Sequence, residues 1–236
     1  MSQTRGTQMT AALQRSLRCT IPALSPIMLA MPGRLAGQAT PVSAALGSRG
    51  MVSSAHAAAT DAGLDVLRRG GNAFDAAVAI AAALNVVEPM NSGMGGYGTI
   101  LVYNAAKHQV LFLNSSTRIP RAVNADAYRS PTPGYLENRR GAKAISTPGN
   151  VPAWEAMSLR FGRLPWKTLF GPAIRLADSG FTLTALDART LATAFPEFSS
   201  YSKNIYGVNG APLAAGQRLV QHDLARSLRL VAQDAR

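Results

Sequence analysis

The segment that determines the fold runs from Gly70 to Gly98 and has the sequence GGNAFDAAVAIAAALNVVEPMNSGMGGYG. A glycine pair precedes an alanine-rich apolar run, and a second glycine cluster follows it. Asn72 is typical of a helix N-cap, and Asp75 three residues later supports the first helical turn. The residues up to about Val87 are apolar on every side, which is typical of a helix buried in a core. We therefore expect a buried helix over residues 73–87.

This segment fits neither a membrane span nor a phosphate loop. Its uninterrupted apolar run, residues 76–84, is far shorter than the roughly 20 residues that a bilayer crossing needs. The cluster GMGGYG follows a helix and precedes a β-rich run, whereas a dinucleotide-binding loop follows a strand and begins a helix. We expect Gly93, Gly95 and Gly96 to form a structural loop in which the backbone passes close to a bulky neighbour.

The neighbouring segments predict an α+β fold. Helical periodicity predicts a helix over residues 56–69, and two β-rich runs at 99–103 and 109–114 predict a hairpin. Later patterns predict a surface loop at 130–141, a short strand at 143–146, helices at 152–161, 165–179 and 184–194, a turn-rich stretch at 206–221 and a last helix from His222.

Composition excludes several classes of function. Of 236 residues, 47% are hydrophobic and 15% charged, so the chain can bury a sizeable core. The single cysteine, Cys19, permits neither an internal disulfide nor a cysteine-based metal site. The net charge of +12 is compatible with nucleic-acid binding, but the basic residues are spread thinly and no zinc-finger or RNA-binding signature is present. We expect an arginine-rich solvated surface and no nucleic-acid partner.

Residues 1–48 differ from the rest of the chain, because no acidic residue occurs before Asp61. Basic residues, an apolar stretch at 21–33 and small residues at 42–47 resemble a secretory leader, although three prolines interrupt the apolar stretch. The alternatives are a disordered extension or a start codon assigned too far upstream. A leader implies a periplasmic or secreted protein, and its absence a cytoplasmic one. We expect the folded domain to occupy residues 49–236.

The chain contains no self-sufficient catalytic constellation. His56, His108 and His222 do not have a metal-ligand spacing and are expected at the surface or at helix caps. No G-x-S-x-G elbow is present. Asp75 is expected to stabilise a helix rather than to act as an acid or base. We expect no metal site.

Several separated motifs resemble the γ-glutamyltranspeptidase family and occur in the family's order. They are RGMVSSAHAAATDAGLDVLRRGGNAFDAAVA, NVVEPMNSGMGGYGTILVYN, PGNVPAWEAMSLRFGRLPWKTLFGPAIRLADSGF and AAGQRLVQHDLARSLRLVA. The resemblance implies part of the four-layer αββα sandwich of N-terminal-nucleophile hydrolases. It also implies a precursor that cuts itself into a large and a small subunit. A threonine at the start of the small subunit would then attack a γ-glutamyl amide of a glutathione-type donor. The resemblance implies that no metal or organic cofactor is needed.

The resemblance also limits which residues can be assigned a role. The chain stops at Arg236, before the family's nucleophilic threonine, so we expect no catalytic residue in it and a fragment that is inactive and unstable alone. The family's large subunit binds the substrate carboxylate with an arginine in a motif resembling FLDFRETAP. Here FLNSSTRIP (residues 112–120) places Ser116 at that position and Arg118 two residues later, on the same face of an extended strand.

Two readings of this departure stay open. Either Arg118 binds the substrate carboxylate, or the substrate is a non-glutamyl acyl amide, because the segment is closer to the LNGSGRAP form of the family's acylase-like branch. Beyond the enzyme hypothesis, a catalytically silent truncated scaffold and a basic nucleic-acid binder are the alternatives. The small subunit of the same precursor is the expected partner.

Overall fold

The computed structural model describes residues 45–116, 120–124, 141 and 144–234. Contacts separate residues 1–45 from one compact unit, Leu46–Arg236, and all the elements below belong to that unit. Cys19, Arg118 and residues 130–140 of the predicted surface loop lie outside the described residues.

The unit contains both helices and short sheets, which confirms the α+β class. The helices are α1 (Ala57–Arg68), α2 (Ala73–Val87), α3 (Asn150–Phe161), α4 (Trp166–Leu169), α5 (Gly171–Ser179), α6 (Ala185–Ala194), α7 (Ser200–Tyr206) and α8 (His222–Gln233), with 3-10 turns η1 (Ala105–Lys107) and η4 (Phe195–Glu197). The strands are β1 (Thr99–Asn104), β2 (Gln109–Asn114), β3 (Phe181–Thr182), β4 (Gly207–Val208), β5 (Ala211–Pro212) and β6 (Arg218–Leu219). They pair as three antiparallel two-stranded sheets, β1–β2, β3–β6 and β4–β5.

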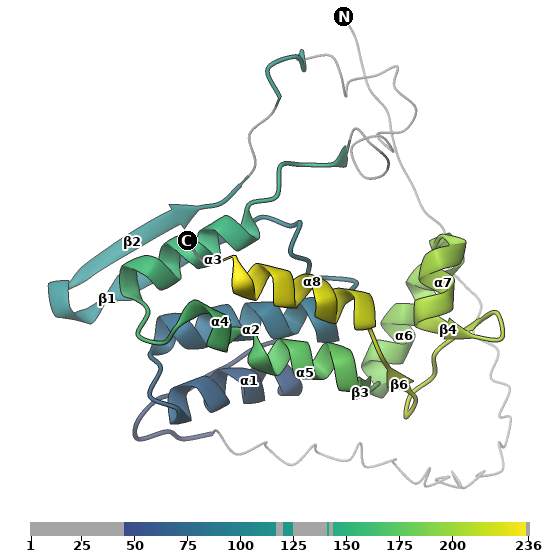
Figure 1. Cartoon of the computed structure of the whole chain (residues 1–236), viewed down its shortest axis with the longest axis horizontal. Helices are drawn as coiled ribbons and strands as arrows, with labels where there is room; N and C mark the ends of the chain where they lie inside the picture. Colours follow the sequence, from purple (N-terminus) through teal and green to yellow (C-terminus); the bar gives the residue numbers. More distant parts are fainter. Residues whose placement is uncertain (1–44, 117–119, 125–140, 142–143, 235–236) are drawn as a thin grey trace, which may run out of the picture. The chain divides into compact units, whose positions relative to one another are not determined.

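Helix α2 lies at the centre of the helical part, as the sequence predicted (Figure 1). Asn72 and Asp75 form a capping box at its start, in which each side chain accepts from the other residue's backbone N–H. Helices α1, α3, α4 and α5 contact α2, and α8 packs against α4 and α5. Val78, Ala82 and Val86 are fully buried, so α2 packs closely with its neighbours. No helix in the described ranges is both long and apolar enough to cross a membrane.

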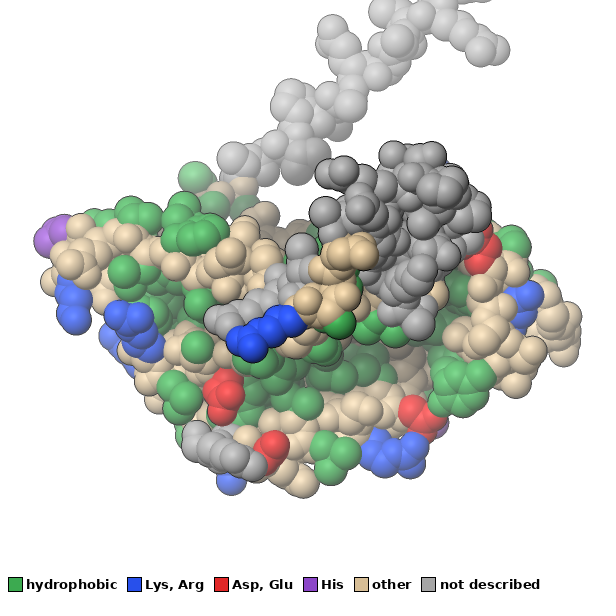
Figure 2. Space-filling model, turned by 90° about the horizontal axis from the view of Figure 1, so that it is seen from above, with side chains coloured by type: hydrophobic (Ala, Val, Ile, Leu, Met, Phe, Trp, Pro, Cys, Tyr) green, Lys and Arg blue, Asp and Glu red, His purple; other side chains and the backbone are tan. Residues whose placement is uncertain are grey.

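The β1–β2 hairpin has two different faces. Pairing of Thr99 with Asn114 fixes the register, so Ile100 faces Leu113 and Val102 faces Leu111 on one side. Ile100, Val102 and Leu111 pack against the core. The opposite face has four large apolar side chains that are 59–73% exposed: Leu101, Tyr103, Val110 and Phe112. Figure 2 shows hydrophobic side chains at the surface on the side where Figure 1 draws the hairpin.

Two sequence predictions of secondary structure are wrong, and one helix was missed. The helix expected over residues 165–179 is split at Phe170 into α4 and α5, because Pro172 has no N–H to continue the hydrogen-bond ladder. Residues 144–146 of the strand expected at 143–146 are not extended in a sheet. Helix α7 was not predicted, because it is short and none of its side chains is buried.

Candidate functional site

The glycine loop Gly93–Gly98 is held against the start of α3. The backbone N–H groups of Gly149 and Asn150 both donate to Gly96 O, at 2.9 and 3.0 Å. The Asn150 side chain donates from Nδ2 to Gly93 O at 2.9 Å. One loop residue thus accepts two backbone hydrogen bonds while the Asn150 amide binds a second loop residue, so the loop conformation depends on α3.

The end of β2 joins the same assembly. Ser115 Oγ donates to Gly98 O at 2.8 Å and accepts from Gly98 N at 3.1 Å, and Ser115 N donates to Gly98 O at 3.0 Å. A Cβ at Gly149 would overlap the Ser115 carbonyl oxygen, so this position requires glycine. We call the set of Gly93–Gly98, Asn114–Ser116 and Gly149–Asn150 the glycine junction.

Of the three glycines in the predicted loop, only Gly96 has a close neighbour among the described residues. A Cβ on Gly96 would lie 2.8 Å from Asn150 Nδ2, so close approach of a neighbour explains this glycine. A Cβ on Gly93 or Gly95 would have no atom within 4 Å. Close packing within the described residues does not explain those two positions.

The structure places Ser116 at the exposed end of β2, within the glycine junction. Its backbone N–H donates to Asn114 Oδ1 at 2.9 Å. Arg118, the predicted substrate-binding residue, lies outside the described residues, so its role stays a prediction. Sequence reasoning missed Ser115 and Asn150, although the Pro-Gly-Asn turn before α3 was a signal of a tight approach.

Asp75 has the structural role that was expected. Its side chain is fully buried, and its carboxylate accepts from Asn72 N at 2.9 Å, from Arg163 N at 3.0 and 3.1 Å and from Leu164 N at 3.3 Å. The carboxylate thus holds the start of α2 and the segment after α3 together. These backbone donors surround both oxygens, which leaves a catalytic acid or base role without support.

The three histidines are at caps, turns and the surface, as predicted. His56 caps α1 by accepting from Ala58 N at 3.1 Å. His108 occupies the left-handed turn of the hairpin, and the exposed His222 lies 3.2 Å from Asp178 Oδ1. Within the described ranges, no three His, Cys, Asp or Glu side chains form a group that could hold a metal ion.

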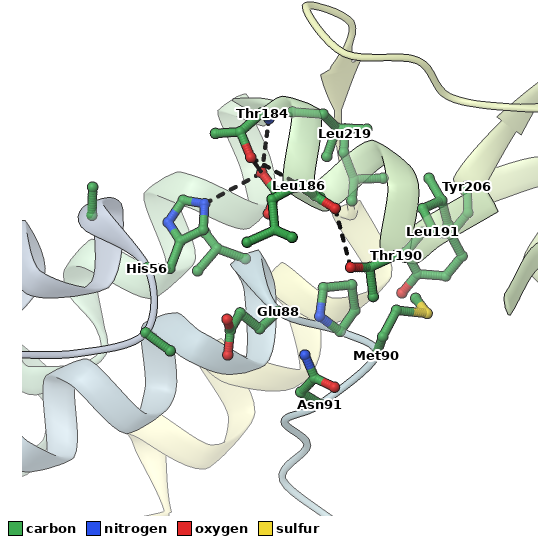
Figure 3. Close-up of a pocket in the computed structure, with 16 residues that line it drawn as sticks. His56, Glu88, Met90, Asn91, Thr184, Leu186, Thr190, Leu191, Tyr206 and Leu219 are labelled. Carbon is green, nitrogen blue, oxygen red and sulfur yellow. Dashed lines mark hydrogen bonds and ion pairs between the residues drawn. The ribbon is translucent and has the colours of Figure 1, made fainter. Parts of the chain in front are cut away.

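A cavity of about 380 Å³ lies between the end of α2, the segment before α1 and helix α6 (Figure 3). Its size is in the range of small-molecule sites. Most of the wall is apolar, and the polar side chains in it are His56, Glu88, Asn91, Thr184, Asp187, Thr190 and Tyr206. Burial raises the pKa of the Tyr206 phenol above its ordinary value of 10.0. None of the glycine-junction residues lines this cavity.

Comparison with known sequences places these features in a family. The model of the family described as Gamma-glutamyltranspeptidase matches residues 59–236. The chain is similar to a glutathione hydrolase proenzyme of Bacillus subtilis, with 35% identity over 190 residues that cover 79% of this chain and 32% of the relative. It is also similar to an Acylase ACY 1 proenzyme of Pseudomonas sp. (strain V22), with 37% identity over 201 residues that cover 80% of this chain and 36% of the relative. The chain spans about a third of the length of these curated relatives.

Solved structures agree with the sequence comparison. The γ-glutamyltranspeptidase of Helicobacter pylori matches with a TM-score of 0.74 and 30% identity, over 80% of this chain and 56% of that chain. A cephalosporin acylase from Bacillus halodurans matches with a TM-score of 0.64 and 28% identity, over 75% of this chain and 34% of that chain. These structures have the N-terminal-nucleophile hydrolase fold, of which this chain contains a part. The chain belongs to the γ-glutamyltranspeptidase family.

Proposed function

We propose that this chain is the amino-terminal part of an enzyme that hydrolyses or transfers γ-glutamyl groups from glutathione-type donors. The observation that carries the proposal is the family match over residues 59–236, supported by sequence similarity to a glutathione hydrolase proenzyme and by structural similarity to a γ-glutamyltranspeptidase. The acyl-enzyme would form on a threonine outside residues 1–236, in a second subunit made from the same precursor. The chain itself would supply scaffold and substrate-binding groups.

The hairpin supports a partner of this kind. Its outer face has Leu101 paired with Phe112 and Tyr103 paired with Val110, all of them exposed. A contiguous apolar face of this kind marks an interface with other polypeptide. We propose that the polypeptide with the threonine contributes the second β-layer over this face.

The substrate class has a second candidate. Ser116 occupies the place of the family's carboxylate-binding arginine, and serine cannot supply a bidentate, charge-assisted hydrogen bond. The similarity to acylase proenzymes points the same way. An amide hydrolase that acts on a non-glutamyl acyl group is therefore the alternative, unless Arg118 binds the γ-glutamyl carboxylate.

The test is an activity assay of the complete gene product with a γ-glutamyl anilide and with a non-glutamyl acyl anilide. The proposal expects turnover of the γ-glutamyl donor. Turnover of the acyl donor alone would favour the acylase alternative, and turnover of neither would favour a catalytically silent scaffold.

Arg118→Ala is expected to lower kcat/KM for the γ-glutamyl donor by about 100-fold, since a charged hydrogen-bonded pair contributes roughly 3 kcal/mol. Arg121→Ala, which removes the same charge at an exposed position outside the glycine junction, is the matched control and should leave kcat/KM unchanged.

A further inference from the structure

The cavity beside α6 combines an apolar wall with an acidic side chain, as expected of a binding site for an organic cation. Its apolar wall includes Val87 and Pro89 from the end of α2 and Leu183, Leu186 and Leu191 from around α6. A volume of about 380 Å³ accommodates a small organic molecule rather than a few waters. The polar side chains in this wall then determine the chemical class of the ligand.

Most of those polar side chains already have partners. Asp187 accepts from Thr184 N at 2.8 Å and from Thr184 Oγ1 at 2.7 Å. The Thr190 hydroxyl donates to Leu186 O at 3.0 Å, and the Tyr206 hydroxyl donates to Gln221 Oε1. These groups are held by the protein and are poor candidates for recognising a ligand.

Glu88 differs from them. Its carboxylate lines the cavity and makes no hydrogen bond or ion pair with any described residue (Figure 3). Partial burial against an apolar wall makes an unpaired carboxylate unfavourable, because low-polarity surroundings solvate charge poorly. A cationic ligand would compensate that charge.

The end of α2 adds to the negative potential. Glu88 is the C-cap of α2, where the helix dipole is negative and a cation is favoured. The last turn of α2 contains no basic residue, whereas α1 has Arg68 in the corresponding place. Among the described residues, no lysine or arginine lines the cavity, although the whole chain has a net charge of +12.

The wall of the cavity contains a second acidic group, Asp187. Asp187 Oδ2 lies 3.5 Å from His56 Nε2, and this nitrogen is buried without a hydrogen-bond partner (Figure 3). A neutral His56 leaves the Asp187 charge in place, and a protonated one offsets it. In both states no described basic residue compensates the Glu88 carboxylate and the end of α2.

We propose that this cavity binds a small primary ammonium compound with an apolar body. The ammonium group lies at Glu88, and the apolar body packs against Leu183, Leu186 and Leu191. A bare metal ion fits poorly, because the cavity offers it mostly apolar wall and the described residues contain no three-ligand acidic or histidine group. The site is independent of the γ-glutamyl chemistry proposed above, since none of the glycine junction lines it.

The test is isothermal titration of the complete gene product with 2-phenylethylamine, at low salt and at physiological salt. Two analogues keep the phenyl ring and change the charge of the other end: 2-phenylethanol is neutral and 3-phenylpropionate is anionic. We expect binding of the amine only, and a weaker affinity at the higher salt. Equal binding of the alcohol, or no binding of the amine, overturns the proposal.

Variants separate the carboxylate from general electrostatics. Glu88→Gln keeps the shape of the side chain and is expected to weaken amine binding by about tenfold or more, the effect of losing a charged hydrogen bond. Glu155→Gln is the matched control, because it removes the same charge on α3, away from the cavity, and should leave the affinity unchanged. Equal melting temperatures of the two variants exclude a folding defect. An unchanged affinity of Glu88→Gln contradicts the proposal, and this result is independent of whether the protein turns over a γ-glutamyl donor.

Discussion

The helical part of the molecule and the hairpin differ in how much of their apolar surface is buried. In the helical part, α2 is covered by α1, α3, α4 and α5, and α8 closes over α4 and α5 (Figure 1). In the β1–β2 hairpin, one face packs on this core and the other leaves Leu101, Tyr103, Val110 and Phe112 exposed. Among the described residues, helices cover the helical core on several sides, whereas nothing covers the outer face of the hairpin.

The difference separates features that this chain forms by itself from the face over which we propose a second layer. A closed helical core predicts that substitutions there change the stability of the chain itself. An open sheet face predicts that substitutions there change association, with little effect on the free energy of unfolding. Each prediction below compares matched substitutions or matched conditions across this boundary.

The largest effect is expected from the same substitution made in the two parts. Leu228→Ala in α8 removes a fully buried side chain and should lower the free energy of unfolding by about 2–5 kcal/mol. Leu101→Ala removes a side chain that is 73% exposed and should change it by less than about 0.5 kcal/mol. Urea unfolding measures both values. Similar losses for the two variants would show that the hairpin face is buried in the isolated chain.

The next effect concerns the buried carboxylate that ties α2 to the segment after α3. Asp75→Asn places a side-chain NH₂ group opposite backbone N–H groups that now donate to the carboxylate. Because these backbone donors lose their acceptor, the free energy of unfolding should fall by about 2–3 kcal/mol. Asp61→Asn makes the same change at an exposed position of α1 and should have almost no effect. Thermal melts of the two variants decide this. A melting temperature of Asp75→Asn equal to that of Asp61→Asn would remove the proposed structural role.

A smaller effect tests the root of the hairpin, where it meets α3. Gly96→Ala forces a Cβ to within 2.8 Å of Asn150 Nδ2 and should cost about 1–2 kcal/mol. Gly95→Ala, one residue earlier, meets no atom within 4 Å and should be nearly neutral. Hydrogen exchange of the Asn150 backbone N–H, which donates to Gly96 O, reports on the contact directly. Equal exchange in the two variants would mean that Gly96 is not a close-contact position.

The smallest effect is a pH dependence between α5 and α8. The hydrogen bond from Arg229 to Asp178, at 2.6 Å, is the largest cause that holds the pKa of the Asp178 carboxyl below its ordinary value of 3.8. The hydrogen bond with His222 is the second cause. A lowered folded-state pKa gives stability that is present above pH 3.8 and lost as the pH falls through the folded value. The stability difference between wild type and Asp178→Asn should therefore shrink on acidification, as followed by urea unfolding at each pH. A difference that stays constant down to low pH would contradict this.

The sequence predicted the elements whose signals are local. Asn72, Asp75 and the apolar run after them defined α2 to the residue, because capping and periodicity act within a few turns. The two β-rich runs at 99–103 and 109–114 predicted the hairpin, and the structure adds its register. The helix over 165–179 was predicted too long, since the effect of Pro172 on the preceding turn was not considered.

The site was predicted less completely, because its contacts join residues far apart in the chain. Asn150 binds Gly93 across 57 positions, and Ser115 binds Gly98 across 17. The spacing of apolar residues along the chain does not predict contacts between residues so far apart in sequence. The apolar cavity was also missed, since Glu88 and Asp187 come together only when α6 folds beside the end of α2.

The central claim is that this chain supplies the scaffold while a threonine elsewhere in the gene product makes the covalent bond. The most direct measurement is an acid quench of the complete gene product during turnover of a γ-glutamyl anilide, followed by peptide mass mapping. The account predicts a γ-glutamyl adduct on a threonine outside residues 1–236, with every peptide of residues 49–236 unmodified. An adduct on any residue of this chain, or turnover without an adduct, would contradict it.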